Sequence, residues 1–419
     1  MMSTEQNDIL GNEEAKRPSG QFGIVPFFAI AGLLIGLLAN FSELASDHRR
    51  LQLGLRLAAV LLLLLVGITA AQRNSGSYNP IIPLLLLFSL AVFSAFLNWP
   101  CCWGLIRWTV LLCCYWAMAR ISSPSPQFRN RGNSLLFGLC MAGAVFSVYA
   151  LKHAVDVGRY STFRASIPGV HPNHQAFLAG LASLAATGLF MSVRQNWYKF
   201  VLLICALPTG AAMVLSGSRT MAVAFLLGLL SFLSLRFGGR ELIKQIGFLL
   251  VLLFTTLITL MLSWSVISDP IENFIFARPF STLSGRVFVW DYVLDNMFRK
   301  PIAPFGLGPG LGRQHLQSFF GKQAHNGYLQ LIVDLGPLSI IPLFIFFVYP
   351  IKHVFCGMKN RPRQTALYFS LLICVLAHAG GESDLDRIGN GSNFIFIISL
   401  TFMWQLKTLQ KDVEDNECH

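Results

Sequence analysis

The stretch LSGSRTMAVAF (215–225) places a lone arginine at the junction of two apolar segments. Arg219 stands among Ser216, Gly217, Ser218 and Thr220, a combination that favours a short turn at the start of a helix. The first N–H groups of a helix lack partners within it, and a guanidinium adds paired donors for phosphate oxygens, so this turn could bind an anion. Alternatively, Arg219 only extends its charged end into water beside an apolar surface.

Two further clusters offer groups for proton transfer or polar binding. His325 and Asn326 directly precede an apolar run in AHNGYLQLIVDLG (324–336). Histidine is a natural proton acceptor for a hydroxyl group near neutral pH, although a lone histidine at such a boundary is often structural. Arg286 opens the amphipathic stretch LSGRVFVWDYVL (283–294), where the alternative is an ordinary solvated charge.

A fourth cluster, VHPNHQAFLAG (170–180), brings His171, Asn173 and His174 together before another apolar run. These side chains could contact a substrate, or the cluster could simply cap a helix, with Asn173 as the capping residue. Asp384 and Asp386 could form a carboxylate pair for a divalent metal. A hard cation takes more oxygen ligands than this short acidic turn offers, so we predict neither a metal nor a cofactor.

Composition indicates what surrounds these clusters. The chain has 419 residues, of which 54% are hydrophobic and 12% charged, and a soluble domain carries about twice that charged fraction. The apolar runs are continuous rather than alternating, which favours membrane-spanning helices over a membrane barrel. The net charge of +12 is explained by basic loops between spans, so we predict no nucleic-acid partner.

The apolar runs predict about 12 transmembrane helices in an all-α integral membrane fold. They fall at 22–40, 52–71, 80–98, 101–119, 133–151, 175–193, 199–216, 220–235, 243–265, 328–350, 366–380 and 392–406. The expected organisation is a cytoplasmic tail (1–21), a polytopic membrane domain (22–408) and a second cytoplasmic tail (409–419).

The charges of the loops predict the orientation. With the N-terminus inside, the cytoplasmic loops are strongly basic, whereas the short outer loops hold few basic residues, as the positive-inside rule requires. Arg219, Arg286 and His325 then lie on the extracytoplasmic side together. The longest outer segment, 266–327, is too long for a structureless connection, and its residues 285–300 have the periodicity of an amphipathic helix lying over the outer membrane face.

Four motifs in this order resemble the O-antigen ligase family, within the O-antigen ligase and polymerase superfamily of bacterial membrane glycosyltransferases. They are VHPNHQAFLAG (170–180), LSGSRTMAVAF (215–225), LSGRVFVWDYVL (283–294) and FGLGPGLG…AHNGYLQLIVDLG (305–336). The resemblance implies a GT-C-like, metal-independent glycosyltransferase in the bacterial inner membrane, with its active site facing the periplasm.

The resemblance also implies substrates and roles for the matching residues. The donor would be a glycan on undecaprenyl pyrophosphate and the acceptor lipid A–core, with membrane lipid surrounding both. Arg219 and Arg286 would hold the pyrophosphate and His325 would act as general base, while Asn326, His171 and Asn173 are candidate substrate-binding residues. Direct attack of the acceptor hydroxyl on the anomeric carbon would invert its configuration.

Other functions are compatible with the same motifs. A repeat-unit polymerase for O-antigen or exopolysaccharide uses a similar donor with another lipid-linked glycan as acceptor, and related enzymes glycosylate protein. A transporter is the non-enzyme alternative, but it should carry ionisable residues near the bilayer midplane and paired half-repeats. Arg107 and His378 are the main polar candidates within the predicted spans, and the sequence has no visible repeat.

Overall fold

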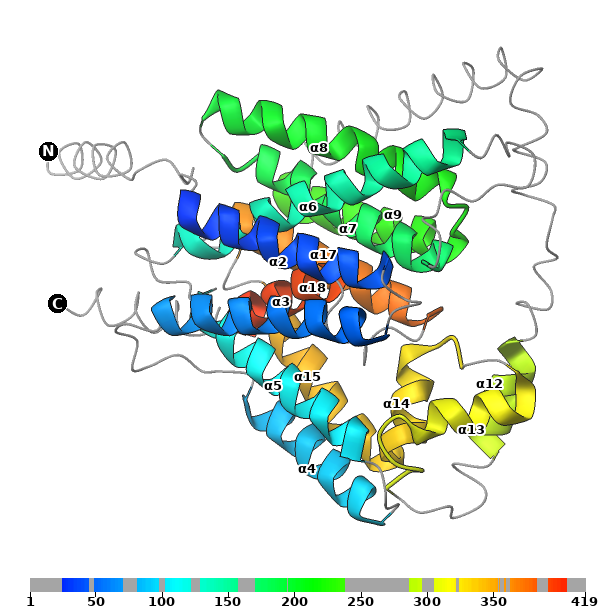
Figure 1. Ribbon diagram of the computed structural model, residues 1–419. Helices are drawn as coiled ribbons and strands as arrows, with labels where there is room; N and C mark the ends of the chain where they lie inside the picture. The colour runs from blue at the N-terminus through cyan, green and yellow to red at the C-terminus, as the bar shows by residue number, and fades with distance from the viewer. Residues whose placement is uncertain are drawn as a thin grey trace, which may run out of the picture.

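In the computed structural model, the described part of the chain is entirely helical apart from its turns (Figure 1). It comprises residues 25–44, 49–70, 81–97, 102–121, 129–156, 170–193, 195–237, 286–295, 305–321, 324–352, 354, 358, 362–382 and 391–404. The predicted all-α fold class is therefore confirmed.

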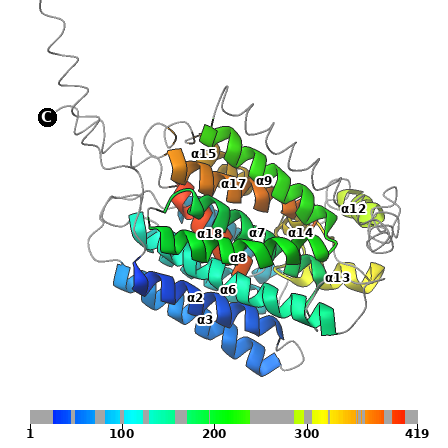
Figure 2. The same cartoon turned by 90° about the horizontal axis from the view of Figure 1, so that it is seen from above.

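Two groups of helices build the bundle, and their bounds follow the predicted apolar runs to within a few residues. The larger group contains α2 (Pro26–Leu44), α3 (Arg49–Ala70), α6 (Arg129–Asp156), α7 (Pro172–Phe190), α8 (Asn196–Leu215), α9 (Arg219–Phe237), α17 (Pro362–Ala379) and α18 (Gly391–Trp404). Beside it lie α4 (Ile81–Leu97), α5 (Cys102–Ile121) and α15 (Ile340–Lys352). The helices α12 (Arg286–Leu294), α13 (Leu311–Phe320) and α14 (Gly327–Leu335) gather at one end of the bundle in both views (Figures 1 and 2).

Small residues allow the central helices to approach closely. A Cβ added to Gly32 of α2 would meet the carbonyl of Leu135 on α6, and one added to Gly143 of α6 would lie 2.7 Å from the Cβ of Ala182 on α7. Close backbone approach through glycine and alanine is typical of helix pairs in lipid, where tight packing rather than water exclusion holds helices together.

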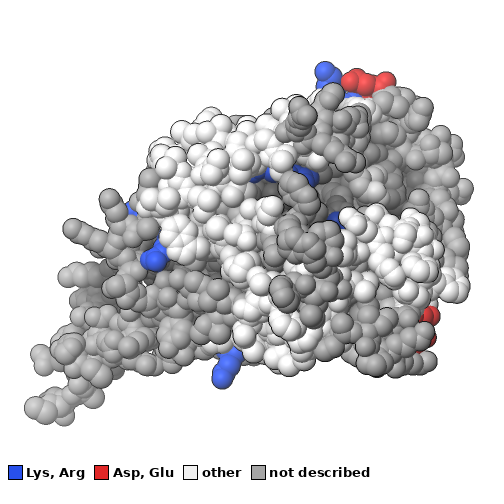
Figure 3. All heavy atoms as spheres, turned by 60° about the horizontal axis from the view of Figure 1, so that its bottom comes forward, with Lys and Arg blue, Asp and Glu red and all other residues white. Residues whose placement is uncertain are grey.

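The outer face of the bundle is apolar. On α3, Leu57, Leu61, Leu65 and Ile68 are all more than half exposed, and the described surface carries few charged side chains in Figure 3. Four helices are long and apolar enough to span a bilayer, at Leu51–Ile68, Asn130–Asp156, Asn196–Leu215 and Arg219–Phe237. The described residues add six shorter apolar helices. The chain is a multi-pass membrane protein by its helix composition, whereas the total of about 12 spans stays a prediction.

The structure corrects the expected continuous span 328–350. The helix α14 ends at Leu335, Gly336 has φ 83°, and the short 3-10 helix η3 (Pro337–Ser339) precedes α15. Pro337 lacks an N–H group and restrains the residue before it from helical geometry, so the apolar run breaks at this pair. The predicted glycine-rich bend (305–312) leads into α13, which begins at Leu311 and which the sequence analysis did not predict.

Several predictions fall outside the described residues. These are the tails 1–21 and 409–419, the span 243–265, the first part of the outer segment (266–285) and the acidic pair Asp384 and Asp386. Of the amphipathic stretch 285–300, residues 286–294 form α12, whose Val289 and Val293 are buried against α13 and α14.

Candidate functional site

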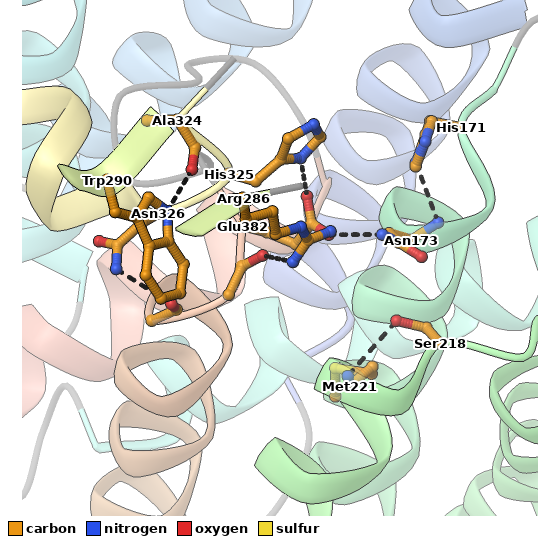
Figure 4. A network of polar contacts seen from close by, with 12 residues as sticks. His171, Asn173, Ser218, Met221, Arg286, Trp290, Ala324, His325, Asn326 and Glu382 are labelled. Atoms are coloured by element: carbon orange, nitrogen blue, oxygen red, sulfur yellow. Dashed lines mark hydrogen bonds and ion pairs between the residues drawn. The ribbon is translucent and has the colours of Figure 1, made fainter. Parts of the chain in front are cut away.

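A buried carboxylate lies at the centre of the site, in the turn that follows α17. The side chain of Glu382 is 4% exposed and meets three partners that come from distant parts of the chain (Figure 4). Its Oε1 accepts from Asn173 Nδ2 and Arg286 Nη2, and its Oε2 lies 3.1 Å from His325 Nδ1. A carboxylate removed from water needs such partners, because its desolvation is otherwise strongly unfavourable.

Arg286 is held against this turn by both terminal nitrogens. Its Nη2 lies 2.8 Å from Glu382 Oε1, and its Nη1 donates to the carbonyl of Gly381 at 2.5 Å. The residue opens α12, whose buried Val289 and Val293 fix the helix against its neighbours. The Arg286 side chain is 19% exposed, so part of it reaches the surface of the protein.

His325 has an unusual backbone conformation directly before α14. Its φ of 47° is positive, and among the described residues it is the one non-glycine position in this region. Left-handed geometry costs an L-residue roughly 1–2 kcal/mol, and such residues gather at functional sites where surrounding contacts hold them. The contact between Trp290 Nε1 and the carbonyl of Ala324, at 2.7 Å, supplies part of that restraint.

The pairing of His325 with Glu382 determines what the imidazole can do. A carboxylate paired with a guanidinium is ionised and only accepts hydrogen bonds, so Nδ1 of a neutral His325 carries the proton and donates it to Oε2. Nε2 then presents a lone pair. The His325 side chain is 28% exposed, and among the described residues no hydrogen bond is made by Nε2. This arrangement leaves Nε2 of a held imidazole exposed and able to accept a proton.

Asn326 holds the start of α14 in place. Its Oδ1 accepts from the N–H groups of Tyr328 and Leu329, and its Nδ2 donates to the carbonyl of Gly380 at 3.1 Å. The side chain therefore caps α14 and ties it to the end of α17, next to the turn that carries Glu382.

The start of α7 differs from the predicted cap. His171, rather than Asn173, is the N-cap residue, and its Nδ1 accepts from the Asn173 N–H while Pro172 occupies the first helical position. The reason is that Asn173 is buried and its side chain turns away from its own helix to bind Glu382 (Figure 4). The rings of His171 and His174 lie 5.7 Å apart.

Arg219 begins α9 at the same end of the bundle. Gly217 has φ 64°, as a tight turn requires, and the buried Ser218 caps the helix by accepting from Met221 N–H. A Cβ on Gly381 would lie 2.5 Å from Thr220 Cγ2, so the first turn of α9 packs on the turn that carries Glu382. The structure thus brings Asn173, Arg286 and His325 onto one carboxylate, with Asn326 and the helix start at Arg219 beside it.

Glu382 is the residue that the sequence analysis missed. It stands two residues before Asp384 in an acidic stretch, and that stretch was interpreted only as an unfavourable metal site. The available signal was its position: it follows a predicted span on the same side as the arginines and the histidine. Within the described residues, no group of three or more His, Cys, Asp or Glu side chains could hold a metal ion.

The fold and this site define a multi-pass helical membrane protein with an ion-paired arginine and an oriented histidine at one end of its bundle. Residues 200–348 match the sequence profile of the family described as O-Antigen ligase. The match includes Arg219, Arg286, His325 and Asn326. This segment of the chain is therefore similar to the O-antigen ligase family, and the predicted resemblance is confirmed.

Two curated proteins are similar in sequence to more than half of this chain. Two relatives bear the name "Putative polysaccharide ligase". The protein from Rickettsia felis is 25% identical over 258 residues, which are 56% of this chain and 58% of that protein. The one from Rickettsia conorii is 24% identical over 266 residues, 59% of this chain and 61% of that protein. The alignments thus span about three fifths of the curated relatives' length.

Proposed function

We propose that this protein is an O-antigen ligase, a glycosyltransferase that moves a glycan from undecaprenyl pyrophosphate to lipid A–core at the periplasmic face of the bacterial inner membrane. The observation that carries the proposal is the buried carboxylate of Glu382, which joins an anion-binding arginine to an oriented base. The similarity of residues 200–348 to the O-antigen ligase family supports this chemistry, because the family implies a lipid-linked glycan donor.

The reaction needs one proton transfer and one charged leaving group. His325 Nε2 accepts the proton of the acceptor hydroxyl as that oxygen attacks the anomeric carbon of the donor glycan. The bond from this carbon to the pyrophosphate oxygen breaks, and undecaprenyl pyrophosphate leaves with the bonding electron pair. Because the attack is direct, the configuration at the anomeric carbon is inverted.

Positive groups stabilise the charge that develops on the leaving pyrophosphate. Arg286 and Arg219 both begin helices at this end of the bundle, and the paired N–H donors of a guanidinium suit phosphate oxygens. In this proposal no metal is required, because the arginines supply the positive charge. Asn326, His171 and Asn173 act mainly by shaping the site, since their side chains contact protein groups.

The distribution of basic residues supports the periplasmic orientation. Arg131 near the start of α6 and Arg236 near the end of α9 lie at the end of the bundle away from the site, and Arg236 lies close to Arg363 at the start of α17. Basic residues concentrate on the cytoplasmic side of membrane proteins, so the end with Glu382 faces outward in this proposal.

A deletion strain tests the acceptor. Loss of a ligase leaves lipopolysaccharide that ends at the core, together with accumulated lipid-linked polymer, and this is the expected result. The measurement is the lipopolysaccharide profile and the lipid-linked glycan of the same cells, with the wild-type gene restored as control. Core capped by a single repeat unit would instead identify a repeat-unit polymerase, and an unchanged lipopolysaccharide with loss of a glycoprotein would identify a protein glycosyltransferase.

A further inference from the structure

Glu382 competes with any other anion that binds the guanidinium of Arg286. Both terminal nitrogens of Arg286 are already engaged, one by the Glu382 carboxylate and the other by the Gly381 carbonyl. A pyrophosphate that used these donors would also stand beside the carboxylate. Two negative charges at hydrogen-bonding distance repel each other strongly where water is scarce. Simultaneous binding of both anions to Arg286 is therefore unfavourable.

Glu382 has a second set of partners available if it leaves Arg286. Its Oε2 is already 3.1 Å from His325 Nδ1, and Asn173 Nδ2 donates to its other oxygen. Neither contact involves Arg286. The residue is therefore placed to change its main partner without entering an unpartnered state.

We propose that the donor pyrophosphate and Glu382 exchange at Arg286, so that donor binding releases the carboxylate to His325. This inference rests on the proposed function and adds a control to it. A carboxylate shared with a guanidinium is partly neutralised, whereas a released one stabilises the imidazolium that forms when His325 accepts a proton. The base thus reaches full strength only when the donor is in place.

The exchange predicts that the wild-type carboxylate weakens donor binding. Glu382→Gln keeps the size of the side chain and one accepting oxygen, but it replaces the other oxygen with an NH2 donor and removes the charge. The variant should bind undecaprenyl pyrophosphate about tenfold more tightly, because the competing anion is gone, and should lose glycan transfer. A residue that only orients the base would lose transfer at unchanged affinity, and a residue that only supports the fold would lose both.

The experiment uses the purified full-length protein in detergent, with undecaprenyl pyrophosphate binding measured by thermophoresis and glycan transfer measured in parallel. Glu382→Asp retains a negative charge and should bind close to wild type. Asp291→Asn is the matched control, because Asp291 is an exposed carboxylate on the helix that Arg286 opens. It should change neither quantity. If Glu382→Gln does not fold, Glu382→Ala must show the same tightening.

The outcomes separate this inference from the proposed function. Tighter binding in Glu382→Gln, with loss of transfer and unchanged controls, supports the exchange. Unchanged or weaker binding in that variant, with weaker binding in Arg286→Ala, overturns the exchange but leaves the donor site intact. Unchanged binding in Arg286→Ala overturns both, because the guanidinium would then have no part in donor recognition.

Discussion

At the scale of single residues, the site depends on how one buried charge is compensated. Glu382 draws its partners from α7, α12 and the segment before α14, so each partner links a different helix to the turn after α17. Removal of one member of a buried ion pair leaves the other charge without compensation, which is usually more costly than replacement of both.

Arg286→Ala should therefore destabilise the protein by about 3 kcal/mol, because the Glu382 carboxylate would lose the positive charge of its guanidinium partner. Adding Glu382→Gln should recover much of this loss, since no buried charge then remains to be compensated. Thermal unfolding in detergent measures both effects, with Arg313→Ala on α13 as the control for loss of a half-buried arginine. If Arg286→Ala alone were as stable as wild type, the result would contradict the stabilising role of the ion pair.

At this scale the sequence pointed to Arg286 and His325 as candidates, but not to the carboxylate that connects them. Arg286 and His325 could be recognised because a cation for phosphate and a base for a hydroxyl are distinctive requirements. Glu382 was not recognised, since burial decides whether an acid in a polar turn is a solvated charge or the centre of a network. Burial at a turn between helices depends on packing between distant segments, which periodicity does not report.

At the scale of helices and turns, close contact between α9 and the turn after α17 sets the position of Glu382. A Cβ on Gly381 would lie 2.5 Å from Thr220 Cγ2 and 3.0 Å from its Oγ1. There is no room for a methyl group unless one element shifts.

Gly381→Ala should thus lower stability by about 1–3 kcal/mol and reduce transfer more than stability alone explains, because the shift moves Glu382 away from His325. Thr220→Ser removes Cγ2 and should partly restore both properties in the double variant. Gly321→Ala offers a comparison outside this contact, although its φ of 62° adds backbone strain to that control. Wild-type transfer in Gly381→Ala would mean that this packing does not position the carboxylate.

Helix positions were predictable because long apolar runs specify spans, and most observed ends lie close to the predicted ones. The break between α14 and α15 was missed because Gly336 and Pro337 stand within a run that is apolar on both sides. The helix α13 was missed because it follows a glycine-rich bend. That bend is held by hydrogen bonds from the N–H groups of Leu307 and Gly308 to the carbonyls of Val333 and Asp334, contacts that no local pattern indicates.

At the scale of the whole molecule, the direction of each helix brings the site together. The starts of α7, α9 and α14 and the end of α17 meet at one end of the bundle. Alternation of spans along the sequence predicts this meeting, since Arg219, Arg286 and His325 all fall in loops of the same parity. In the proposed function, the lipid-linked donor and the lipid-anchored acceptor both reach this site from the surrounding leaflet.

The most direct test of the central claim is in vitro transfer from undecaprenyl pyrophosphate-linked glycan to lipid A–core by the purified protein, with His325→Asn beside wild type. Asparagine tolerates the left-handed backbone of this position better than alanine but cannot act as the base. Wild type should transfer glycan, and the variant should bind donor normally while its transfer falls by at least about 100-fold. Transfer at the wild-type rate by His325→Asn would contradict the account.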